Sequence, residues 1–262
     1  MMEVERLQGY LRHSAARQYE AVALPAFTFF YHAPDAFPHF NYAIPDRNVT
    51  EDVAGALAAL RAACAARGRV PRLEYVEAFA PRLGARLAAA GYAQEGRYPL
   101  MVCTPETLRA APPVADLAIV PIGPDAPLPL VRGGVTVRRC GFGAGDEAVS
   151  DEDAERFRPL LTHNATFLGR WAEEAVCVAS YSEPYDGLVE IAGIATIPPY
   201  RRRGLASALT GAVVTAAFAR GVVAAFLSAA DERAGRIYQR LGFQPFAHLL
   251  AYRLPDLPPD AT

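Results

Sequence analysis

The densest group of residues that could do chemistry lies within IAGIATIPPYRRRGLASAL, residues 191–209. Six residues form a turn between a strand-like run and a helical run: Arg201, Arg202, Arg203, Gly204, Leu205 and Ala206. A helix N-terminus has unpaired N–H groups and a partial positive charge, so it can bind an anion such as phosphate. Arginine side chains match phosphate oxygens, and Gly204 lets a ligand approach the backbone closely. A solvated basic turn before a core helix is the alternative, and the spacing alone does not separate the two.

The wider pattern around this turn is more specific. It runs strand, P-x-Y-R-x-R-G-x-A, helix, strand and A-x-x-x-Y-x-x-x-G-F. This arrangement resembles the GNAT acyltransferase superfamily over roughly residues 165–254, with weaker coverage back to about residue 116. Arg201, Gly204 and Ala206 stand at the positions of the family's R-x-x-G-x-G/A motif, which binds the pyrophosphate of coenzyme A. The resemblance implies that the six turn residues bind acetyl-CoA as a co-substrate and that no metal is needed.

Further site residues follow from the same resemblance. Three residues stand where the family's strand meets the pantetheine arm of the cofactor: Ile194, Ala195 and Thr196. Tyr238 matches the family's tyrosine, which contacts the cofactor and protonates the departing thiolate. A core tyrosine on an amphipathic helix is the alternative for Tyr238.

Glu190 is the favoured general base, because it opens the strand 188–197 where the family often has a glutamate. The alternative is that Glu190 only ends a turn in solvent. Three other residues could act as a base: Glu183, Asp186 and His163. Of these, His163 fits a helix-end residue better than a base.

Asp231 departs from the family pattern. It stands seven residues before Tyr238, where the family often has an asparagine that contacts the cofactor. Aspartate lacks the amide donor and adds a negative charge near the cofactor. Because aspartate is a good N-cap, we expect Asp231 mainly to cap a helix over residues 232–240.

The elements that must position these residues occur twice. A helical run ends at Gly68 and a second at Gly91, which is 23 residues later; the pattern recurs at Gly221 and Gly242, which are 21 residues apart. Strand-like runs follow each helix, at 72–79 and 97–104 in the first half and at 222–229 and 246–254 in the second. Two similar helix–strand–helix–strand units predict two domains of one α/β (α+β) fold.

We expect a GNAT-like domain over 1–112 and a second one over 113–262, with an exposed linker at 104–116. Each would have a mixed, mostly antiparallel twisted sheet flanked by helices, with strands 188–197 and 222–229 splayed in the second domain. Residues 150–161 predict a capped helix, and three strands follow it. The Pro/Gly-rich region 121–145 could hold the first strand of the second domain plus a long loop, although that strand has no clear position within it.

The first half lacks the features that carry chemistry. It has no R-x-x-G-x-G/A motif, and Leu87 stands at the position that aligns with Tyr238. We therefore interpret residues 1–112 as a degenerate copy that holds no nucleotide.

Composition limits the other function classes. The 262 residues are 52% hydrophobic and 21% charged, a composition that excludes wholesale disorder. The net charge of −2 and the pI near 6.2 predict neither a nucleic-acid nor a membrane partner. The apolar stretch 205–230 is broken at Arg220-Gly221 and predicts a helix and a buried strand rather than a membrane span. Four scattered cysteines and a polar N-terminus favour the cytoplasm.

The favoured function is transfer of the acetyl group of acetyl-CoA to a primary amine, of a small molecule or of a peptide N-terminus or side chain. A cluster of acids and aromatics would suit a cationic amine, although solvated turn residues look the same: Tyr181, Glu183, Tyr185, Asp186 and Glu190. A CoA-binding sensor and the transfer of another acyl group are the alternatives. The sequence is compatible with a monomer or a homodimer.

Overall fold

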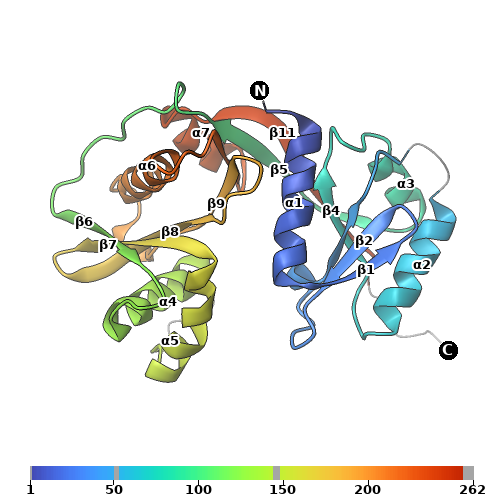
Figure 1. Ribbon diagram of the computed structural model, residues 1–262, viewed down its shortest axis with the longest axis horizontal. Helices are drawn as coiled ribbons and strands as arrows, with labels where there is room; N and C mark the ends of the chain where they lie inside the picture. The colour runs from blue at the N-terminus through green and yellow to red at the C-terminus, as the bar shows by residue number, and fades with distance from the viewer. Residues whose placement is uncertain (1, 50–52, 144–147, 256–262) are drawn as a thin grey trace. The chain divides into compact units, whose positions relative to one another are not determined.

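The computed structural model describes residues 2–49, 53–143 and 148–255. These residues form two compact units (Figure 1). Unit 1 comprises Met1–Leu100 and Phe246–Thr262, and unit 2 comprises Met101–Pro245. This division differs from the expected one at residue 112, because the chain leaves unit 1 within one strand and returns to it within the last strand.

Unit 1 contains three helices and a sheet among its described residues. In chain order its elements are α1 (Val4–Gln18), β1 (Glu20–Leu24), β2 (Phe27–Tyr31), the 3-10 helix η1 (Pro38–Phe40), β3 (Tyr42–Pro45), α2 (Ala54–Ala65), β4 (Arg72–Val76), α3 (Leu83–Ala89), the first part of β5 (Ala93–Cys103) and most of β11 (Gln244–Arg253). The strand order β1-β2-β3-β4-β11 is antiparallel except for the parallel β3–β4 pair.

The C-terminal strand belongs to unit 1 because of its pairing and its packing. β11 pairs antiparallel with β4 over five residue pairs, from Leu249↔Val76 to Arg253↔Arg72. Leu250 and Tyr252 of this strand are buried in the core of unit 1.

Unit 2 holds the predicted chemistry. Its elements are β6 (Leu117–Ile122), α4 (Leu128–Phe142), α5 (Asp151–Phe157), η2 (Arg158–Thr162), β7 (Asn164–Trp171), β8 (Glu174–Ser182), β9 (Leu188–Thr196), η3 (Pro198–Tyr200), α6 (Leu205–Phe218), β10 (Ala224–Ser228) and α7 (Glu232–Arg240). The strand order is β6-β7-β8-β9-β10, antiparallel except for β9–β10. The predicted mixed, mostly antiparallel sheet is confirmed.

The sheet of unit 2 lies between helices, with α6 on one face and α4 and α5 on the other (Figure 1). Successive side chains of a strand point to opposite faces, so each strand contributes to both cores. In β8, Ala179 and Tyr181 pack in the core with α6, whereas Val178 packs in the core with α4. The helix predicted over 150–161 begins with a capping box between Ser150 and Asp153 and continues into η2.

Helix α4 differs from the expectation for residues 121–145. The first strand of unit 2 is β6, which ends at Ile122, and the region that follows is a helix rather than a strand and a long loop. Glycines and β-branched residues in this segment disfavour a helix locally. They nevertheless allow close packing: a Cβ on Gly141 would lie 2.6 Å from the Cβ of Ala195 in β9. Residues 144–147, the end of the region, lie outside the described residues.

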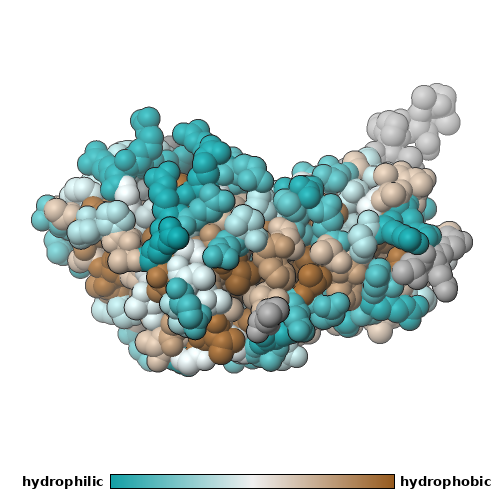
Figure 2. Space-filling model, turned by 90° about the horizontal axis from the view of Figure 1, so that it is seen from above, coloured by the Kyte–Doolittle hydropathy of each residue, from teal (hydrophilic) through white to brown (hydrophobic). Residues whose placement is uncertain are grey.

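The segment predicted as a linker, residues 104–116, contains turns but no helix or strand. It lies wholly within unit 2, and its residues Leu108, Ala111 and Val114 pack against the core with α6, so it does not connect the two units. Figure 2 shows one face of the molecule, on which hydrophilic and hydrophobic residues are interspersed. Within the described residues, no helix combines the length and the apolar character needed to cross a bilayer.

Candidate functional site

The predicted site is organised around the point where β9 and β10 part. The two strands pair in parallel over only three residue pairs, from Ala224↔Leu188 to Phe226↔Glu190. β9 continues to Thr196, and its later residues pair with β8. A register shift in the β8–β9 pairing accompanies Gly193, which has a φ of 64°. A bulge of this kind bends a strand, and such a bend would favour the predicted splay.

The alternation of side chains divides the site residues between the two faces of the sheet. Ile191 is buried in the core with α6, as is its partner Tyr181. Glu190, one residue earlier, therefore faces α4. Its backbone N–H donates to Ser182 Oγ at 2.8 Å, and this hydroxyl donates to the Glu190 carbonyl at 3.3 Å. Glu190 is half-buried and lies at the last pair before the strands part.

The turn before α6 has the backbone that anion binding requires. η3 leads into four exposed residues, 201–204, of which Arg202 and Gly204 have positive φ values of 65° and 81°. Gly204 is the N-cap residue of α6, and because it has no side chain it cannot accept a hydrogen bond from the first N–H groups of the helix. Since the N–H groups of the first turn have no intrahelical partner, those of Leu205 and Ala206 lie at an uncapped helix end.

Two of the three arginines are held by other parts of unit 2. Arg201 donates from Nε to the Thr196 carbonyl at 3.0 Å and from Nη2 to the Gly141 carbonyl at 2.9 Å. The Arg203 guanidinium lies 5.6 Å from the ring centroid of Trp171 and 5.2 Å from that of Tyr200. Arg201 thus ties the turn to β9 and α4, and Arg203 ties it to the aromatic rings.

Trp171 and Tyr200 support the turn, and sequence reasoning did not assign them this role. The Tyr200 hydroxyl also donates to Glu174 at 2.6 Å, which fixes its ring. Tyr200 stands within the P-x-Y-R motif and could have been noticed there. Trp171 lies about 30 residues earlier and gave no local signal.

Helix α7 places the tyrosine. Asp231 is its N-cap, and Asp231 Oδ1 accepts from the Ala234 N–H at 2.7 Å, so the predicted capping role is confirmed. Tyr238 is half-buried and packs edge-on against Phe243, with ring centroids 6.1 Å apart. Burial raises the pKa of the Tyr238 phenol above its ordinary value. The phenol therefore stays protonated at neutral pH and is able to donate a proton or a hydrogen bond.

The expected cluster of acids and aromatics is not a single surface. Tyr181 is buried in the core with α6, on the opposite face from Glu190. Glu183 and Asp186 lie in the exposed turn between β8 and β9, and Tyr185 lies with them. His163 is the exposed residue at the end of η2, in agreement with the helix-end interpretation.

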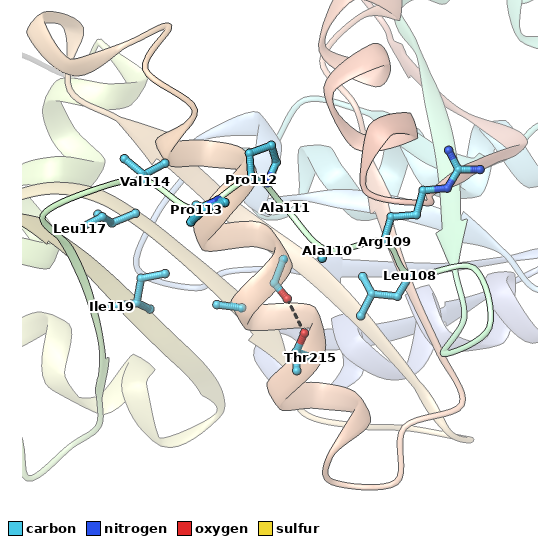
Figure 3. Close-up of a pocket in the computed structure, with 13 residues that line it drawn as sticks. Leu108, Arg109, Ala110, Ala111, Pro112, Pro113, Val114, Leu117, Ile119 and Thr215 are labelled. Atoms are coloured by element: carbon cyan, nitrogen blue, oxygen red, sulfur yellow. Dashed lines mark hydrogen bonds between the residues drawn. The ribbon is translucent and has the colours of Figure 1, made fainter.

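Two sizeable cavities of unit 2 are lined by residues other than the predicted site residues. One, of about 550 Å³, lies between the segment 108–119 and α6 (Figure 3). Its lining is mainly apolar; Thr215 in its wall donates to the Gly211 carbonyl at 2.9 Å, and the Arg109 side chain extends away from α6. The other, of about 860 Å³, lies between α4 and Ile197–Pro199, just before the turn.

The geometry agrees with a comparison of the sequence with known families. Residues 138–243 match the sequence model of the acetyltransferase (GNAT) family. They form a GNAT acetyltransferase domain. All predicted site residues lie inside this GNAT region, including the turn, Glu190 and Tyr238.

Solved structures show the same fold over most of the chain. A GCN5-related N-acetyltransferase from Kribbella flavida is 23% identical, with a TM-score of 0.82, and the alignment covers 98% of this chain and 97% of that one. A GCN5-related N-acetyltransferase from Sphaerobacter thermophilus is 18% identical, with a TM-score of 0.61 and coverage of 87% and 76%. A tandem GNAT protein of the clavulanic acid biosynthesis pathway is 14% identical, with a TM-score of 0.62 and coverage of 90% and 80%. No curated protein matches the chain.

The GNAT region begins in α4 and contains nothing of the first half of the chain. The two halves nevertheless share an order of elements, β3-α2-β4-α3-β5 and β9-α6-β10-α7-β11. In each, the first two strands of this series are parallel. The interpretation of residues 1–112 as a degenerate copy stays a prediction.

Proposed function

We propose that this protein is an N-acetyltransferase that transfers the acetyl group of acetyl-CoA to a primary amine. The observation that supports the proposal is the uncapped N-terminus of α6, which follows η3 and the turn 201–204 after a strand that parts from its neighbour. The helix end suits a pyrophosphate. The freed edge of β9 suits the amides of a pantetheine arm, which can pair with it like an added strand.

The residues present fit the chemistry of coenzyme A. Among the described residues, a Cβ on Gly204 would meet only Val114, whose Cγ2 lies 3.5 Å away, so the backbone here leaves room for a ligand. The N–H groups of 202–206 would hold the pyrophosphate, and the backbone of Ile194, Ala195 and Thr196 would hold the pantetheine arm. Bound acetyl-CoA supplies the thioester that is the source of the acetyl group.

Two side chains would move protons. Glu190 Oε would accept a proton from the attacking amine, directly or through water, because only the neutral amine is a nucleophile. The Tyr238 hydroxyl would donate to the departing sulfur, and its raised pKa keeps this proton in place at neutral pH. The acceptor is a small-molecule amine or the N-terminal or side-chain amine of a peptide.

The experiment is Tyr238→Phe, assayed by thiol release over a panel of primary amines. General acids contribute about 10²–10⁴-fold to a rate, so kcat should fall by up to this factor, while CoA affinity measured by calorimetry stays nearly unchanged. Tyr181→Phe is the matched control: it removes a hydroxyl from another tyrosine of unit 2, in the core with α6.

The outcomes separate the alternatives. Unchanged turnover in Tyr238→Phe refutes the role of the tyrosine and leaves the acetyl transfer standing. CoA binding without turnover of any amine supports the sensor instead. Faster turnover with a longer acyl-CoA supports transfer of another acyl group.

A further inference from the structure

Arg138 is a charged side chain of α4 that points into the sheet beside the bulge. Its Nη2 donates to Ser180 Oγ at 2.6 Å, and its guanidinium lies 5.3 Å from the ring centroid of Phe157. It also lies against the backbone of β9, because a Cβ on Gly193 would be 2.4 Å from Nη1. The glycine at the bulge leaves the space that this guanidinium fills.

Arg138 has no counter-ion among the described residues. Burial alone accounts for its lowered pKa, and no carboxylate offsets it. Its Nε is buried and has no hydrogen-bond partner in the described part of the chain. Arg138 is half-buried, with a hydroxyl and an aromatic ring beside its guanidinium but no carboxylate from the described residues. Because removing a charge from water costs free energy unless an opposite charge offsets it, this guanidinium is suited to receive an anionic ligand.

Arg72 in unit 1 shows how this chain offsets the charge of a buried arginine with carboxylates. Its side chain is 2% exposed and forms ion pairs with Glu74 at 2.6 Å and Glu95 at 2.5 Å. Burial lowers its pKa, but the two carboxylates outweigh this and raise the pKa overall. At Arg138, burial lowers the pKa and no carboxylate of the described chain raises it again.

Polar groups surround Arg138 on the same face of the sheet. Ser180 is buried and hydrogen-bonded to buried Thr166, with 2.9 Å between the two hydroxyls. Ser180 pairs with Ala192, so Glu190 lies two residues away on the same face, about 6.6 Å along the strand. A cation and a carboxylate thus flank one strip of β9, next to the point where β9 and β10 part.

We propose that Arg138 binds a carboxylate of the acceptor, and that the acceptor is therefore an amino acid or another amine that carries a carboxylate. This inference rests on the proposed function. The guanidinium supplies the charge and a forked donor edge that match a carboxylate. The amine of the same molecule would then lie toward Glu190. Arg138 acts as a specificity-determining residue.

The test uses pairs of amines that differ by the carboxylate: phenylalanine with 2-phenylethylamine, and β-alanine with ethylamine. Binding to the full chain is measured by calorimetry with CoA present, and turnover is measured with acetyl-CoA. Wild type should favour the carboxylate-bearing member of a pair. For the carboxylate-bearing amine, Arg138→Met should raise Kd and KM about 10- to 100-fold, the loss expected for a charged hydrogen bond, and should change kcat little. For the plain amine, Kd and KM should stay unchanged.

Two variants guard against a purely structural effect. Arg138→Lys keeps the charge and loses the fork, so it should retain part of the preference. Arg139→Met removes the neighbouring arginine, which pairs with Asp153 at 3.0 Å, and should leave the preference unchanged.

The proposal is overturned if wild type acetylates both members of a pair equally well, or if Arg138→Met weakens binding and turnover of both members equally. Either result leaves acetyl transfer intact. Carboxylate binding that needs Arg138 without any turnover supports the role of Arg138 and refutes the proposed function. If wild type neither binds nor turns over any member of the pairs, the role of Arg138 and the proposed function are both refuted.

Discussion

Gly204→Ala tests the assignment of the anion site most directly. Gly204 has a φ of 81°, in the left-handed region, which costs a residue with a Cβ about 1–2 kcal/mol. The new methyl group would lie 3.5 Å from Val114 Cγ2, which is ordinary contact and adds no clash. The free energy of unfolding should therefore fall by about 1–2 kcal/mol from backbone strain alone.

Gly221 provides a matched control at the other end of α6. Its φ is 83°, and a Cβ there would meet no atom of the described part of the chain within 4 Å. Gly221→Ala should carry the same strain and lower the free energy of unfolding by the same amount. Chemical denaturation of both variants measures this, and equal losses show that strain is matched.

CoA binding should then separate the two variants. The methyl group of Gly204→Ala would stand where a phosphate must come within hydrogen-bonding distance of the backbone. We expect loss of about one charge-assisted hydrogen bond, or at least a tenfold rise in Kd by calorimetry, whereas Gly221→Ala binds as wild type does. Equal affinities in the two variants would refute the reasoning that places the pyrophosphate on this turn.

Two other predictions concern stability. Asp231→Ala should lower the free energy of unfolding by about 1 kcal/mol through loss of the cap, whereas Asp231→Asn should keep it; urea denaturation checks this, and equal losses in both variants would contradict the capping role. Burial raises the pKa of the Cys64 and Cys177 thiols to about 12, above the value of about 8.5 for an unfolded chain. The stability that these two protonated thiols contribute is thus complete below pH 8.5 and is lost as pH rises toward 12. The free energy of unfolding should therefore be lower at pH 10.5 than at pH 8, and this decline should be smaller in Cys177→Ala.

The parts of the fold that follow from local pattern were predictable from the sequence. The predicted helix over 232–240 is α7, and the glycines at 221 and 242 follow α6 and α7, as the periodicity indicated. Asp231 could be assigned as a cap because capping depends only on residues within one turn. The turn before α6, with its glycine at positive φ, could be placed for the same reason.

Helix α4 escaped prediction because its stability comes from packing and not from local preference. Gly133, Gly134 and Gly141 weaken a helix in isolation. In the fold, a Cβ at Gly133 would lie 2.9 Å from Ala175 and one at Gly134 would lie 2.9 Å from Ile122, so larger residues would push the helix off the sheet. Only the tertiary contact reveals why the glycines are there.

Side-chain partners far apart in sequence were equally hidden. Arg201 was assigned to phosphate from its position in the motif, but its guanidinium donates to the carbonyl of Gly141, 60 residues away. Tyr181 and Glu190 were grouped from their proximity in sequence, yet the antiparallel pairing of β8 with β9 sends them to opposite faces. The role of Arg138 depends on Ser180, 42 residues later, and on the bulge at Gly193.

The segment after β3 gives a physical reason to expect no phosphate in unit 1. β3 occupies the place in its series that β9 occupies in unit 2, but β3 is followed by Asp46 and not by a run of arginines. The Asp46 carboxylate accepts from the Thr28 hydroxyl at 2.7 Å and pairs with Arg12 Nη2 at 2.8 Å. An arginine is therefore engaged by a carboxylate of the chain itself, and the negative charge of Asp46 opposes an anion. This supports the prediction of one cofactor per chain, bound in the half that contains Gly204.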